Sequence, residues 1–169
     1  MDQINQYTKM HTFSIENERA FVLLSAGNLA TTQAVVYQIQ FDLNDIQAKE
    51  NLFMSKHMFE AAHYVGEISK KIQAKHVDHD KQESPDFGAT FILGGQIKDQ
   101  ELHLYMIYPE GNCILVSKEK PFLQIGETKY GKPILDRPVN PLLSFQDAAV
   151  VHWFQSILRY VATYPLAFL

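Results

Sequence analysis

The chain has 169 residues, of which 46% are hydrophobic and 20% charged, and its formal net charge is −4. This composition is typical of one globular domain, spanning 1–169, and it excludes general disorder. The acidic balance argues against nucleic acid and membrane lipid as partners, because both attract basic surfaces.

Residues 9–15 and 19–25 are rich in β-branched and aromatic side chains and flank the polar turn 16–18. They therefore predict a β-hairpin. From Asn28, a predicted N-cap, apolar residues recur at steps of three and four and predict a long amphipathic helix. The residues expected to face the core are Leu29, Thr32, Val36, Ile39, Leu43 and Ile46.

A second helix is predicted from about Ser55, and its buried face comprises Met58, Ala62, Val65, Ser69 and Ile72. The period then changes to two, which predicts an antiparallel meander of four strands. Those strands are 88–97, 101–108, 112–117 and 121–126. A last helix is predicted over 143–160, and the segregated order of strands and helices favours a layered α+β fold.

Cys113 is the single cysteine, so an intrachain disulfide is excluded and no CxxC pair can bind zinc. No apolar run reaches the length of a membrane span, and the polar N-terminus is unlike a signal peptide. We therefore expect a cytoplasmic protein with no cofactor and no bound metal.

The stretch FLQIGETKYGKPILD (122–136) looks like a family signature, and four further stretches accompany it. They are KMHTF (9–13), LLSAGNLATTQAV (23–35), FGATFILGGQI (87–97) and LYMIYPEGN (104–112). Together they resemble the bacterial proteasome-related proteins called Anbu, relatives of proteasome β subunits and of the HslV-type peptidase. The resemblance runs from Asp2 to about Asp147. It implies a four-layer αββα sandwich of the N-terminal-nucleophile hydrolase type, incomplete here because the first hairpin and the final strands are missing.

In such hydrolases the first residue carries a hydroxyl or thiol, and its own α-amine accepts the proton. A free amine titrates at about 7.7–8.0, so it is a usable general base near neutral pH. The resemblance implies a threonine or serine nucleophile, an aspartate and a lysine. Lys9 matches the lysine, where a cation would help to keep the amine neutral. Met1 and Asp2 match no nucleophile, so we expect the chain as written to be inactive toward peptides.

The resemblance also implies a substrate cleft. Ser25 and Gly27 match its strand-to-helix loop, although a purely structural turn at Gly27 explains that glycine equally well. Gly126, Glu127 and Thr128 match the segment that in proteasome β subunits reads Gly-Ser-Gly. Glu127 departs from the proteasome pattern but agrees with Anbu.

Two other chemical interpretations of the sequence are weaker. The stretch 76–80 (HVDHD) is compatible with a metal cluster, but a solvated helix end is the preferred interpretation. Cys113 is compatible with a thiol nucleophile, but a cysteine within a strand is usually a small buried hydrophobe. His57 and His63 are six residues apart and therefore share no helical face.

Two hypotheses of function remain. In the first, the chain is a truncated peptidase of the family, with a peptide or protein substrate and self-association into a ring or helical oligomer. In the second, it is a non-catalytic structural subunit of a proteasome-like oligomer, because its two helices offer surface to neighbours as well as to the core.

Overall fold

The computed structural model describes residues 8–75, 86–117, 119, 122–126, 144 and 146–147. The chain falls into two compact units, Met1–Leu115 and Val116–Leu169. Among the described residues, no helix is both long and apolar enough to cross a membrane. The prediction of a single domain stays a prediction.

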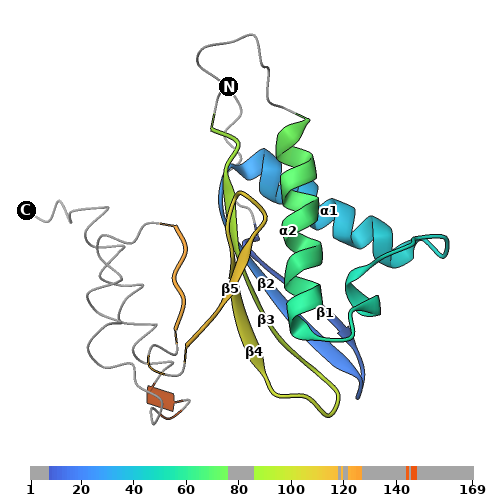
Figure 1. The fold of residues 1–169 in the computed structure, drawn as a ribbon, viewed down its shortest axis with the longest axis vertical. Coiled ribbons are helices and arrows are strands. Elements are labelled where there is room, and N and C mark those ends of the chain that lie inside the picture. Colours follow the sequence, from blue (N-terminus) through green and yellow to red (C-terminus); the bar gives the residue numbers. More distant parts are fainter. Residues whose placement is uncertain are drawn as a thin grey trace, which may run out of the picture. The chain divides into compact units, whose positions relative to one another are not determined.

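The first unit contains a five-stranded antiparallel sheet whose strands lie in chain order (Figure 1). The strands are β1 (Met10–Ile15), β2 (Arg19–Gly27), β3 (Ala89–Ile97), β4 (His103–Ile107) and β5 (Cys113–Leu115). The turns between them contain Asn17, Asp99 and Gly111, all with positive φ. Asparagine, aspartate and glycine are the residues that tolerate this conformation best. The predicted hairpin and three strands of the predicted meander are thus confirmed.

Two helices lie on one face of this sheet (Figure 1). They are α1 (Leu29–Asn44) and α2 (Met58–Ala74), and the short 3-10 helix η1 (Leu52–Met54) lies between them in the chain. Their buried side chains join those of β2, β3 and β4 in one core, which includes Phe21, Leu23, Val35, Ile39, Val65, Phe91, Leu93 and Ile107. The α+β class is therefore confirmed, with one sheet and one helical layer.

The predicted buried face of α2 is confirmed for Met58, Ala62, Val65 and Ser69, and Ile72 packs against the core while partly exposed. In α1 the predicted buried face is confirmed for Thr32, Val36 and Ile39, and Leu43 packs against the core while partly exposed. The prediction is wrong at both ends, since Leu29 is 37% exposed, and Ile46 lies beyond the helix and is fully exposed. The buried face also includes Thr31 and Val35, and the Thr31 hydroxyl donates a hydrogen bond to the Phe87 carbonyl at 3.0 Å.

The face of the sheet opposite the helices also carries apolar side chains. Side chains alternate along a strand, so the neighbours of the core positions point to this second face. Met10, Val22 and Ile114 lie there and are 56%, 37% and 45% exposed. Neither α1 nor α2 covers this face.

In the second unit, residues 122–126 form no strand, so the predicted strand over 121–126 is wrong. Pro121 cannot donate a ladder hydrogen bond, and Gly126 leaves the extended region with a φ of 81°, so little regular strand is available. Of the predicted helix 143–160, Gln146 and Asp147 are described and are helical. Ser144 accepts a hydrogen bond from the Asp147 backbone N–H at 3.1 Å, as an N-cap does.

Helix α2 packs directly on backbone of the β4–β5 turn. A Cβ atom at Gly66 would lie 2.0 Å from the Gly111 carbonyl oxygen. Beside this contact, the Gln73 side-chain amide donates to the Pro109 carbonyl at 2.8 Å. Because Gly66 has no side chain, α2 can approach the β4–β5 turn this closely.

We predict that Gly66→Ala destabilises the protein by about 1–3 kcal/mol, because the new methyl group forces α2 away from the turn. Helix propensity alone would stabilise this variant by about 1 kcal/mol, so the sign of the change is diagnostic. The measurement is the free energy of unfolding in urea. Gly94→Ala is the control, since a Cβ there meets only a terminal methyl of Leu104. A stabilised Gly66→Ala protein would contradict this packing.

Candidate functional site

Lys9 and Ser25 meet where β1 begins and β2 nears its end. The Ser25 backbone N–H donates to the Lys9 carbonyl at 3.1 Å. This bond extends the β1–β2 register, in which Met10 lies opposite Leu24, so Lys9 lies opposite Ser25. Directly opposed residues project from the same face of a sheet. Lys9 is exposed and Ser25 is buried, and the structure thus brings together two of the residues predicted for the site.

Gly27, also predicted for the site, ends β2 with a φ of 108°. A Cβ atom there would lie 2.4 Å from the Gly88 carbonyl oxygen. The same carbonyl accepts a hydrogen bond from the Asn28 backbone N–H at 2.9 Å. The structural explanation of Gly27 is therefore supported, because no side chain fits between these two backbone segments, and its role in substrate binding stays a prediction.

Asn28 connects the start of α1 to the segment before β3. Its side-chain oxygen accepts from the Thr31 backbone N–H at 3.1 Å, which confirms the predicted N-cap. Its side-chain amide donates to the Asp86 carbonyl at 3.1 Å. Asp86 in turn accepts from the Gly88 backbone N–H at 2.7 Å. The corner that carries Ser25 and Gly27 is thus held from two sides.

The segment 86–88 is a part of this corner that sequence reasoning missed. A signal for it exists, since Pro85-Asp86 followed by Gly88 is a typical turn sequence in which the aspartate bonds to the backbone two residues later. The turn was detectable, but its contact with Asn28 was not, because 58 residues separate Asn28 and Asp86.

The remaining predicted cleft residues belong to the second unit. Gly126 is exposed and has a positive φ of 81°, a conformation that favours glycine. Glu127 and Thr128 lie outside the described residues. Lys9, Ser25 and Gly27 are therefore the predicted site residues whose mutual arrangement the structure shows.

Neither alternative chemistry gains support. No group of three or more histidine, cysteine, aspartate or glutamate side chains suited to a metal occurs in the described part of the chain, and the stretch 76–80 lies outside it. Cys113 is partly buried in β5, and burial raises the pKa of its thiol. A thiol with a raised pKa is a poor nucleophile at neutral pH.

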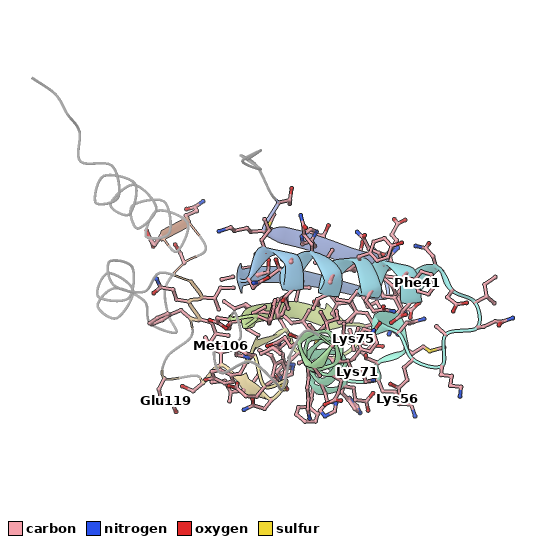
Figure 2. All side chains as sticks on the ribbon, turned by 90° about the horizontal axis from the view of Figure 1, so that it is seen from above. Phe41, Lys56, Lys71, Lys75, Met106 and Glu119 are labelled. Carbon is pink, nitrogen blue, oxygen red and sulfur yellow. The ribbon has the colours of Figure 1, made fainter. Side chains whose placement is uncertain are left out.

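A groove of about 950 Å³ lies between α1, α2 and the loop that joins them. Asp42 of α1 borders it and accepts two hydrogen bonds, from the Tyr64 hydroxyl at 2.6 Å and from the Gln38 side-chain amide at 2.7 Å. Burial raises the pKa of Tyr64, and the bond to Asp42 raises it further. Lys71 of α2 and Lys75, directly after the end of α2, also line the groove and are labelled in Figure 2.

The sequence did not predict this groove. One available signal was Asp42 itself, which is the sole charged residue among the 16 residues of α1. A lone charge on an otherwise uncharged helix usually has a partner, because an unpaired charge near a core is costly.

Comparisons with known proteins place this arrangement among solved structures. No family model matches the chain, and no curated protein matches it. Anbu from Yersinia bercovieri is 38% identical, with a TM-score of 0.83, and the match covers 93% of this chain and 64% of that one. Anbu from Hyphomicrobium sp. strain MC1 is 41% identical, with a TM-score of 0.77 and coverage of 92% and 69%. The helical assembly of the Anbu complex from Pseudomonas aeruginosa is 33% identical, with a TM-score of 0.82 and coverage of 93% and 66%.

The matches cover a larger share of this chain than of its relatives. Nearly all of this chain aligns, whereas it spans slightly less than two thirds of the Yersinia protein. The comparisons therefore concern the part of the relatives that corresponds to these 169 residues.

We predict that Asn28→Ala lowers the free energy of unfolding by about 1–2 kcal/mol, because α1 loses its N-cap and the bond to Asp86 is lost with it. Asn44→Ala is the matched control, since Asn44 is exposed at the other end of α1 and its amide bonds only to the Gln40 carbonyl of the same helix. Both free energies are measured by urea unfolding. If the two variants lose equal free energy of unfolding, the bonds of Asn28 add no special stability, and the prediction is wrong.

A second prediction concerns pH. The pKa of Tyr64 is raised in the folded state above its unfolded value of about 10. The stability that this shift contributes is complete below pH 10 and is lost as the pH rises further. Unfolding measured from pH 8 to 11 should therefore show a steeper loss of stability in the wild type than in Tyr64→Phe. Tyr37→Phe, at an exposed position of α1, is the matched control.

Proposed function

This chain belongs to the Anbu family of proteasome-related proteins, and on that premise we propose that it provides the scaffold of an N-terminal-nucleophile peptidase acting on a peptide or protein. The observation that carries this proposal is the Lys9–Ser25 pair at one end of the sheet, next to the rigid Gly27 corner. Lys9 matches the family lysine and is exposed, so its ammonium group is accessible to a reacting group.

In this proposal a hydroxyl on a terminal residue attacks the scissile carbonyl, and the α-amine of the same residue takes the proton. The positive charge of Lys9 favours the neutral, proton-accepting form of that amine. The backbone around Gly27 forms a wall of the cleft, and Gly126, Glu127 and Thr128 match a further cleft segment of the family.

The open face of the sheet supports the four-layer form of the fold. Large apolar patches on soluble proteins are normally covered, and Met10, Val22 and Ile114 are exposed on this face. We propose that a second sheet packs there, as sheets do at a separation of about 10 Å, and that a second helical layer completes the sandwich.

The alternative function is that of a non-catalytic structural subunit. One relative, from Pseudomonas aeruginosa, is described as a helical assembly of the Anbu complex. We propose that this chain likewise associates with copies of itself, into a ring or a helical oligomer. The single cysteine fits a reducing compartment, so the cytoplasm is the proposed location.

The peptidase proposal is tested on a fusion whose first residue is a threonine or serine. A hairpin that begins with this residue is fused in front of the chain, and hydrolysis of fluorogenic peptides is measured. We expect measurable turnover from the fusion. Lys9→Ala in the fusion should lower kcat by about 10²–10⁴-fold, the range typical of acid–base assistance.

Lys49→Ala is the matched control, because Lys49 is also exposed but lies in the loop after α1, and it should leave the rate unchanged. Turnover by the fusion that survives Lys9→Ala would refute the assigned role of Lys9. A fusion that folds but remains inactive would favour the structural subunit.

A further inference from the structure

The exposed residues of α1 carry no charge. Six of them recur at steps of three and four residues and form one stripe, the α1 stripe, which comprises Ala30, Gln33, Tyr37, Gln40, Phe41 and Asn44. Tyr37 and Phe41 are 69% and 55% exposed. The exposed residues of α2 provide a contrast, since they include Glu60, Lys70 and Lys71.

Helix α1 is therefore apolar or uncharged on two sides. One side, which includes Val35 and Ile39, is buried against the sheet. The one charged residue, Asp42, bonds to Tyr64 toward the groove and leaves the stripe uncharged. Figure 2 shows Phe41 on α1 and Lys71 on α2. Tyr37 and Phe41 therefore expose aromatic surface outside the face that the sheet covers.

We propose that the α1 stripe is the contact surface between two copies of this chain, an assignment that rests on the self-association proposed above. Each copy carries a net charge of −4, so two copies repel over most of their surfaces. The α1 stripe has no charge to repel a second copy. It also has none to attract a strongly charged partner, and this favours its own copy as the occupant.

A two-fold axis perpendicular to α1 gives the simplest pairing, because the same patch then serves both copies. With the axis near residue 39, midway between the two aromatic residues, Tyr37 of each copy packs against Phe41 of the other. Aromatic pairs of this kind favour offset or edge-to-face contact.

The loop after α1 enlarges this contact. A 16-residue helix is about 24 Å long, and one helix pair buries less than the roughly 1,200 Å² expected of a stable interface. Ile46 is fully exposed just beyond the helix. It lies seven residues past the proposed axis, and so reaches the second copy near Gln33, where the small Ala30 leaves room.

The test is the mass of the full chain, measured by analytical ultracentrifugation over a range of concentrations. We expect self-association by the wild type, and at least about tenfold weaker association in the double variant Tyr37→Glu, Phe41→Glu, because charge would be buried at the contact. The matched control is Phe59→Glu, since Phe59 is 54% exposed but belongs to α2. Circular dichroism checks that each variant is folded.

A cross-linking experiment tests the axis with milder substitutions. In a Cys113→Ser background, Gln40→Cys places a thiol beside its own copy, whereas Asn44→Cys separates the two thiols by about 15 Å along the helix. A short bis-maleimide should therefore join two Gln40→Cys chains and leave Asn44→Cys chains single.

The outcomes separate the two proposals. If Tyr37→Glu, Phe41→Glu associates as strongly as the wild type and no cross-link forms at position 40, the α1 stripe is not the contact surface, although self-association itself would still hold. A wild type that stays monomeric at all concentrations would overturn both. Loss of association in Tyr37→Glu, Phe41→Glu but not in Phe59→Glu, together with the cross-link, would establish the surface.

Discussion

The close approach of two backbone segments, at Gly27 and Gly88, is the constraint on which the first unit depends. At this point the chain leaves β2 for α1, and the carbonyl of Gly88 occupies the space that a side chain on Gly27 would need. The hydrogen bond from Asn28 to the same carbonyl joins the helical layer to the start of β3. Any displacement here would move Ser25, and Lys9 with it, because the two are bonded through their backbones. The residues that hold the backbone in place here are thus next to the residues proposed for the site.

Much of this arrangement follows from local sequence rules. A turn over 16–18 places Ile15 opposite Arg19, and counting outward along the hairpin then places Lys9 opposite Ser25. The pairing at the site is therefore a consequence of the hairpin and its turn. The buried face of α2 followed from its period, since each residue there meets the core of its own unit. The start of helix α1 was harder, because Thr31 there bonds to the Phe87 carbonyl, 56 residues away in the chain. The spacing of apolar residues along the sequence gives no information about such a contact.

The incorrect predictions have the same cause, because they too concern features that local sequence does not determine. Ile46 continues the apolar period of α1, yet the helix ends at Asn44 and leaves it in water. The run 121–126 has strand-like composition, but a strand also needs a neighbour and a suitable backbone, and Gly126 does not keep to the extended region. The groove beside Asp42 and Tyr64 depends on how two helices cross, which composition does not reveal. Local sequence patterns thus predict the helices and strands. Contacts between residues far apart in the chain decide which side chains those helices and strands bury and which they expose.

The contact of Gly66 with Gly111 has a consequence for the order in which the protein folds. These residues are 45 positions apart in the chain, so this contact of α2 cannot form until the β4–β5 turn has been synthesised. At roughly 5–20 residues per second on the ribosome, the part of α2 around Gly66 waits for seconds before that turn covers it. During that interval this part is available to chaperones, and the early hairpin of β1 and β2 is the part that can form first, because its contacts are the most local.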